Sequence, residues 1–211
     1  MSHSHDKGLA AGSWALAALA AAVAIAGWPA AGPGLAAFQT SQAVRDAAGR
    51  PVDPLATPGL VTVFFFVAPD CPISNRYAPE IARLHRQFAS QGVALWLVYV
   101  EPDVTPAEVA RHRAEYGLDL PALFDAAHEL VRAAGAVVTP EAAVFVGRER
   151  AYSGRIDDRV VDFGRVRPAP TRRDLSDAVA AVLAGRPVAE PRIPGVGCII
   201  GPPPDSPSRP R

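Results

Sequence analysis

The sequence predicts an α/β fold in which helices cover both faces of a central mixed β-sheet. Residues 60–67 form an uncharged run rich in Val and Phe, which is typical of a strand buried on both faces. Apolar residues then recur at helical spacing from Ile73 to Phe88, with charged residues between them. Because strand-like and helical segments continue to alternate, the pattern favours a layered arrangement of sheet and helices.

The chain has 211 residues and predicts one compact domain between a leader and a tail. Residues 1–36 form the leader, residues 37–185 the folded domain, and residues 186–211 a Pro- and Gly-rich tail that carries the second cysteine. About 150 residues remain for the domain, which is enough to build one hydrophobic core.

Helix boundaries after the first helix are predicted by capping residues. The segment Thr105-Pro-Ala-Glu108 is a capping box that begins a helix, and Gly117 ends it. Asp125 can cap a short helix that ends at Gly135. The segment Thr171–Asp174 begins the last helix. Its apolar stripe consists of Leu175, Val179, Val182 and Leu183.

Cys71 lies where the first predicted strand meets the first predicted helix. Pro72 suits the first helical turn because the N–H that it lacks would have no partner there. The unpaired N–H groups and the positive end of the helix dipole favour a thiolate, which lowers the cysteine pKa and makes the sulfur nucleophilic. The alternative is a buried structural cysteine, but the position and the flanking residues favour the reactive one.

Residues 43–185 resemble the thioredoxin-like superfamily, and within it the redoxin branch of alkyl hydroperoxide reductase and thiol-specific antioxidant (AhpC/TSA) proteins. The resemblance implies a thioredoxin-like fold. The segments that carry it are the Asp-x-x-Gly-Arg turn at 46–50, the strand–Cys–helix unit at 61–88, the next strand at 93–100, the segment 137–146 and the hairpin arm 152–158.

The resemblance also implies a substrate groove. In this family a Thr-Pro bond, here Thr139 to Pro140, is cis and faces the active thiol, exposing backbone with which an extended substrate can pair. An ordinary trans proline at a strand start is the alternative. The polar rim of the groove is expected to consist of Asp70, Ser74 and Asn75. Arg155 is expected to add positive charge there, or else to be a surface ion-pair partner.

Two departures from the family's patterns limit the chemistry. Dithiol thioredoxins carry Cys-x-x-Cys, whereas Ser74 stands at the second position here and cannot resolve a mixed disulfide. Peroxiredoxins carry Pro-x-x-x-Thr/Ser-x-x-Cys, and here Phe64 and Ala68 replace the proline and the hydroxyl residue. The sequence therefore argues against fast peroxidase activity.

Cys198 is the only other cysteine and lies in the Gly-rich segment 193–201. Related redoxin proteins carry a similar Gly-Cys-x-Ile ending, which implies a second cysteine able to reach a sulfenic acid at Cys71 and form a disulfide. The alternative is a permanent structural disulfide between Cys71 and Cys198, because closing such a long loop stabilises a fold by roughly 4 to 5 kcal/mol on the chain-entropy model. A disulfide between Cys198 and another protein chain is a third possibility.

The leader predicts the compartment. No charged residue lies between Lys7 and Arg45, and Ala, Leu, Val and Ile dominate residues 9–31, as in an export signal or a single membrane anchor. Residues 24–26 fit a signal-peptidase site, whereas Trp14 and Trp28 bracket the run as interfacial anchors would. Both alternatives place the domain outside the cytoplasm, in the periplasm or as a secreted protein. A retained anchor would in addition attach the protein to a membrane through residues 9–31.

Other functional classes receive no support. The net charge is zero and no basic cluster occurs, which argues against nucleic acid. No cofactor or metal is expected: Asn75 stands where a copper chaperone of this fold would have its second thiol, and Cys-x-x-Cys-His is missing. The predicted function is a thiol–disulfide oxidoreductase or peroxiredoxin-like peroxidase that acts on a protein disulfide partner or a peroxide, with an unidentified reductant. A binding module without enzymatic activity is the competing hypothesis.

Overall fold

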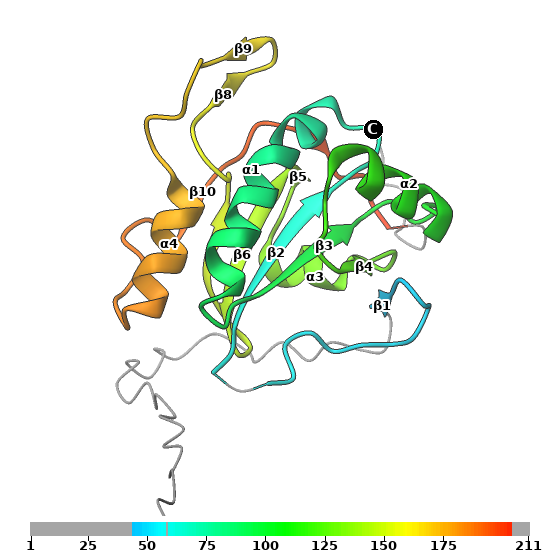
Figure 1. Cartoon of the computed structure of the whole chain (residues 1–211), viewed down its shortest axis with the longest axis horizontal. Coiled ribbons are helices and arrows are strands. Elements are labelled where there is room, and N and C mark those ends of the chain that lie inside the picture. The colour runs from blue at the N-terminus through cyan, green and yellow to red at the C-terminus, as the bar shows by residue number, and fades with distance from the viewer. Residues whose placement is uncertain (1–43, 58, 204–211) are drawn as a thin grey trace, which may run out of the picture.

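A computed structural model of the chain describes residues 44–57 and 59–203. Its main sheet has seven strands in the order β1-β4-β3-β2-β6-β7-β10 (Figure 1). They are β1 (Arg45–Asp46), β2 (Val61–Val67), β3 (Ala94–Tyr99), β4 (Ala122–Phe124), β6 (Glu141–Val146), β7 (Glu149–Gly154) and β10 (Arg192–Ile193). Strands β2, β3 and β4 run parallel and β6 pairs antiparallel with β2, so the predicted mixed sheet is confirmed.

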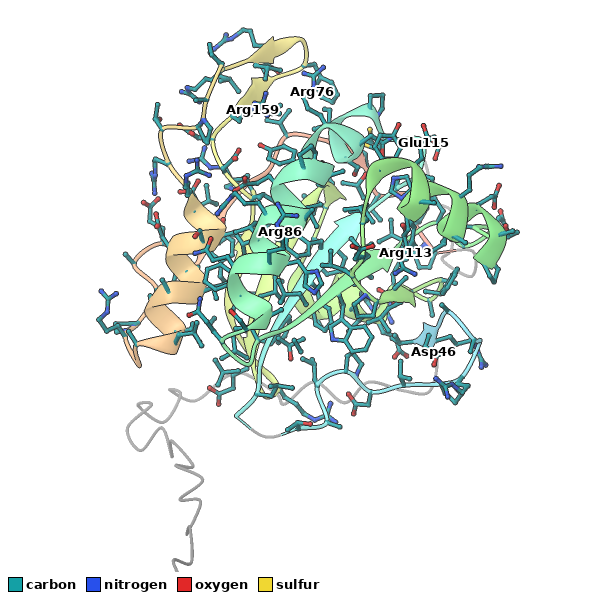
Figure 2. The ribbon with its side chains drawn as sticks, viewed as in Figure 1. Asp46, Arg76, Arg86, Arg113, Glu115 and Arg159 are labelled. Atoms are coloured by element: carbon teal, nitrogen blue, oxygen red, sulfur yellow. The ribbon has the colours of Figure 1, made fainter. Side chains whose placement is uncertain are left out.

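Helices lie on both faces of this sheet, as the sequence predicts (Figure 1). They are α1 (Pro72–Ala89), α2 (Pro106–Tyr116), α3 (Glu129–Ala134) and α4 (Asp174–Leu183). Because side chains alternate along a strand, Val63 and Phe65 pack in the cluster that contains residues of α1, α2 and α4. Phe64 and Phe66 point the other way and pack in the cluster that contains residues of α3. Exposed side chains such as Arg76 and Arg86 project from α1 (Figure 2).

Two predicted helix starts are modified by tertiary contacts. The α3 helix begins at Glu129, later than its predicted cap, because His128 adopts a left-handed conformation and the Asp125 carboxylate accepts from the backbone N–H groups of Glu129 and Val131 at 2.7 and 2.9 Å. The α4 helix begins at Asp174, since the hydroxyl and N–H of Thr171 bond to the Asp158 carboxylate instead of capping the helix. The capping box of α2 and its left-handed Gly117 are as predicted.

The C-terminal segment is built into the fold. Strand β10 extends the edge of the main sheet beside β7, and β11 (Cys198–Ile199) pairs antiparallel with β5 (Val138–Thr139). A separate two-stranded hairpin consists of β8 (Val160–Asp162) and β9 (Arg165–Val166). The buried Glu141 carboxylate holds the segment, because it accepts from the Gly195 N–H at 3.1 Å and pairs with Arg192 at 3.3 Å.

Two glycines permit this close packing. A Cβ at Gly154 would lie 1.8 Å from the Ile193 carbonyl oxygen, and one at Gly197 would lie 2.1 Å from the Thr139 carbonyl oxygen. Both positions therefore require a residue without a side chain.

Among the described residues, none of the helices combines the length and apolar character that a membrane crossing needs. The predicted leader, residues 1–36, lies outside the described residues.

Candidate thiol site

Cys71 is the N-cap residue of α1 and follows β2 at the carboxyl end of the sheet. Only 2% of its surface is exposed. The Ser74 N–H donates to Sγ at 3.5 Å, and the thiol form donates to the Thr139 carbonyl oxygen at 3.1 Å. The Thr139–Pro140 bond is cis, as the resemblance implies. The helix start and the Thr-Pro segment thus meet at one sulfur atom.

Cys198 lies beside Cys71 because of the pairing between β11 and β5. The register places Cys198 directly opposite Thr139, the residue whose carbonyl oxygen accepts from Cys71. Both cysteines line the same cavity, and the thiol and backbone N–H of Cys198 lower the pKa of Cys71. Both cysteines are free thiols in this structure. The two sulfur atoms, far apart in the sequence, therefore form one dithiol site.

The two thiols differ in acidity. Burial raises the pKa of Cys71, but Cys198, the Thr139 side chain and the Ser74 N–H stabilise the thiolate more strongly and bring that pKa below its ordinary value. Burial and the hydrogen bond to Cys71 raise the pKa of Cys198 to about 11. Near neutral pH Cys71 is thus the better nucleophile, and Cys198 is a protonated thiol that stabilises its thiolate.

A cavity of about 300 Å³ opens beside the two sulfur atoms. Its walls come from the end of β2, the end of β3, the start of α3, the cis-Pro segment and the C-terminal segment. They include Ala68, Asp70, Cys71, Val100, Glu101, Pro102, His128, Thr139, Cys198 and Ile199. Within the described part of the chain, no Lys or Arg lines this cavity.

The structure brings together only part of the expected groove. Asp70 is exposed at the cavity wall, and Pro72 is exposed in the first turn of α1. Thr139 is buried against Cys71. Ser74 is also buried, so it supplies its N–H to the sulfur, while its hydroxyl oxygen has no partner among the described residues.

Asn75 and Arg155 point elsewhere. The Asn75 amide donates to the Pro69 carbonyl oxygen at 2.8 Å, and its oxygen lies 2.9 Å from Nε2 of His112 on α2. Asn75 therefore braces the loop before Cys71. The Arg155 guanidinium donates to the Asp174 carboxylate at 2.6 Å. Arg155 is therefore an ion-pair partner, the alternative that the sequence analysis gives for it.

Sequence reasoning singled out neither Glu101 nor His128 as a site residue. Both line the cavity, and His128 Nε2 donates to the Val100 carbonyl oxygen at 2.7 Å. One signal was present for Glu101: it follows a buried strand parallel to β2, and the carboxyl ends of parallel strands meet at one edge of a sheet.

Known proteins share this architecture. The chain is similar to an uncharacterized conserved protein from Geobacillus kaustophilus, at 25% identity and a TM-score of 0.66 over 78% of this chain and 89% of that one. It is also similar to a hypothetical protein from Sinorhizobium meliloti, at 27% identity and a TM-score of 0.61 over 74% and 88% of the two chains. DsbF from MTB shares the fold at 16% identity and a TM-score of 0.50, over 66% and 92%.

No curated protein matches the chain. The sequence profile of the AhpC/TSA family, in contrast, matches residues 36–152, which is more than half of the sequence. This match covers β2, Cys71, α1 and the cis Thr139–Pro140 bond. The chain therefore belongs to the AhpC/TSA family and has its thioredoxin-like fold.

Proposed function

We propose that the protein is an extracytoplasmic thiol–disulfide oxidoreductase whose redox pair is Cys71 and Cys198. The observation that carries this proposal is the register of β11, which sets Cys198 opposite Thr139 and beside Cys71 on the wall of one cavity. A second thiol at this place supplies what Ser74 cannot, a sulfur that can displace a partner bound to Cys71.

The cycle has two balanced steps. The Cys71 thiolate attacks one sulfur of a substrate disulfide, the substrate S–S bond breaks, and the second substrate sulfur leaves as a thiolate that takes a proton from water. Cys198 then attacks Cys71 Sγ, loses its proton and displaces the first substrate sulfur, which also leaves with its electron pair. The substrate disulfide is reduced to two thiols, and Cys71 and Cys198 are oxidised to a disulfide. An external dithiol that restores both thiols closes the cycle.

The composition of the cavity favours a disulfide over a peroxide as the substrate. Ala68 lies at the cavity wall where the family's peroxidases have a hydroxyl residue, and none of the described wall residues is Lys or Arg. A peroxide that is being cleaved develops negative charge on its leaving oxygen, and the described wall offers no guanidinium or ammonium group to stabilise it. A disulfide leaving group is a more stable anion and depends less on such a donor.

The proposed partner is a protein disulfide. Ile199 and Val137 are 85% and 53% exposed, and they lie in or beside the two strands that hold Cys198 next to Cys71. Exposed apolar side chains next to a reactive group are suited to contact a protein segment. The apolar, uncharged residues 9–31 support export or membrane anchoring, and a mass measurement of the exported chain distinguishes a cleaved from a retained leader.

Turnover on a disulfide-containing peptide, with a dithiol as reductant, tests this function. The parent should turn over, Cys71→Ser should lose all activity, and Cys198→Ser should accumulate a mixed disulfide between Cys71 and the peptide. If Cys71→Ser kept its partners and the parent showed no turnover, the protein would be a binding module. If hydrogen peroxide oxidised the parent much faster than the peptide did, the substrate would be a peroxide.

A further inference from the structure

One carboxyl group beside the thiols has no part in the cycle above. Glu101 follows β3, and Cys71 follows the parallel neighbouring strand β2, so both lie at the same edge of the sheet (Figure 1). Glu101 lines the cavity together with Cys71 and Cys198. Its Oε2 atom is buried and has no hydrogen-bond partner among the described residues. Buried polar atoms are nearly always paired, so this oxygen has a free site for a proton or a thiol.

The second step of the cycle needs a proton acceptor. Burial and the interaction with Cys71 raise the pKa of Cys198 to about 11, so Cys198 is a thiol at neutral pH. In the resting site its proton stabilises the Cys71 thiolate, which lowers the pKa of Cys71. Once Cys71 is part of a mixed disulfide, its sulfur carries no charge and can no longer take that proton. Only a thiolate attacks a disulfide efficiently, so another base has to act.

We propose that Glu101 accepts the proton of Cys198 when Cys198 attacks the mixed disulfide at Cys71. This inference rests on the proposed Cys71–Cys198 cycle. In the step, the Cys198 S–H bond breaks and its proton passes to Glu101 Oε2, directly or through a water molecule. The Cys198–Cys71 S–S bond forms, and the bond from Cys71 to the substrate sulfur breaks. The substrate leaves as a thiolate, and Glu101 then returns its proton to solvent.

The surroundings of Glu101 suit this role. Burial raises the pKa of Glu101 to about 7, and the negative charge of Asp70 adds to the effect. A base with a pKa near the working pH is ionised often enough and still binds a proton well. Asp70 and Glu101 are also the two residues that line both the thiol cavity and a second hollow, which opens toward α2. The second hollow gives the proton a route to solvent that does not pass the sulfur atoms.

Other titratable groups face the same region and belong in the design of the test. They are Asp70 before α1, Cys71, His128 before α3, Cys198 in β11, and Asp103, Glu108 and Arg111 in and before α2. Among the described residues, the rival bases on the cavity wall are Asp70, which is exposed, and His128. Its Nε2 atom is occupied by the Val100 carbonyl oxygen, so only Nδ1 could act.

A stopped-flow experiment with one equivalent of 4,4′-dithiodipyridine separates the two steps. Attack by Cys71 releases one coloured thiopyridone, and attack by Cys198 releases the second. The variants are Glu101→Gln, its matched control Glu115→Gln on the exposed surface of α2 (Figure 2), Asp70→Asn and His128→Asn.

In the parent and in Glu115→Gln, the rate of the second phase should rise with pH and level off above about 7. In Glu101→Gln the second phase should be slower by about 100-fold at neutral pH and should rise tenfold per pH unit past pH 7, up to the pKa of Cys198 at about 11. The first phase should be unchanged. In Asp70→Asn the rate of the second phase should level off at a lower pH, because the negative charge that raises the pKa of Glu101 is gone. This variant provides a second readout if Glu101→Gln fails to fold.

Three results would overturn the proposal. A second phase in Glu101→Gln with the parent's rate and pH profile would exclude Glu101. A levelling point that is lost in His128→Asn and kept in Glu101→Gln would assign the base to His128. A folded parent that releases only one thiopyridone would contradict the Cys71–Cys198 cycle itself, and the role of Glu101 with it.

Discussion

Replacing Gly197 with Ala should separate the two thiols without removing either. A Cβ at this position would lie 2.1 Å from the Thr139 carbonyl oxygen and 2.6 Å from its carbon. Ordinary contacts begin at about 3.4 Å, and both atoms belong to backbone, so the C-terminal segment has to move by at least roughly 1 Å. Only two residue pairs join β11 to β5, and the new contact falls next to one of them, Cys198 with Thr139.

The effect on chemistry follows from this displacement. Misplacing a reacting group by about 1 Å can reduce a rate by about 100-fold, so closure of the Cys71–Cys198 disulfide should slow by about that factor. The pKa of Cys71 should rise as well, because Cys198 then stabilises the Cys71 thiolate less. The assay is the second phase of thiopyridone release, together with the pH dependence of Cys71 alkylation.

Gly201→Ala is the matched control, since a Cβ there meets no atom within 4 Å. It should close the disulfide at the parent's rate. If Gly197→Ala also closed the disulfide at that rate with an unchanged Cys71 pKa, the pairing of β11 with β5 would not be what positions Cys198.

Three further predictions concern acidity and stability. A haloacetamide should label Cys71 at a lower pH than Cys198, whose pKa is about 11, and equal labelling in a mass measurement would contradict the assigned roles. Asp125→Ala should lower the free energy of unfolding by about 2 kcal/mol in a urea titration, because two buried N–H groups lose their acceptor; exposed Asp119→Ala should have little effect. Because the pKa of Glu101 is raised to about 7 on folding, its contribution to stability is present at low pH and is lost as pH rises through that value. The stability of the parent relative to Glu101→Gln should therefore fall by up to about 3 kcal/mol between about pH 4 and about pH 9, and a constant difference would show that Glu101 is not buried as described.

Local patterns in the sequence were enough to predict the fold. The Val- and Phe-rich run before Cys71 and the helical spacing after it correspond to β2 and α1. These signals depend on neighbours within a few residues, such as the capping box at Thr105, and tertiary contacts change them only at helix ends. Thr171 is an example, because Asp158 competes for it and no capping pattern records that.

The site was predictable only in part, because its remaining members come from distant segments. Cys198 was found by cysteine content and by resemblance, but its place opposite Thr139 depends on a pairing of two-residue strands too short to leave a periodic signal. The role proposed for Glu101 depends on its position between the thiol cavity and the second hollow, which the sequence does not show. The sequence predicts Asn75 at the rim of the groove. In the structure its side-chain oxygen lies beside Nε2 of His112, because α2 packs there.

The redox pair itself is tested most directly by mapping the disulfide that forms on oxidation. The fully reduced protein is treated with one equivalent of a small disulfide, blocked at free thiols, digested and analysed by mass. The account predicts a loss of two hydrogen atoms from the intact chain and a single cross-linked peptide that joins Cys71 to Cys198. Two results would contradict it. One is a stable adduct of the small disulfide at Cys71 together with a Cys198 that stayed reduced and therefore carries the blocking group. The other is a disulfide between two chains.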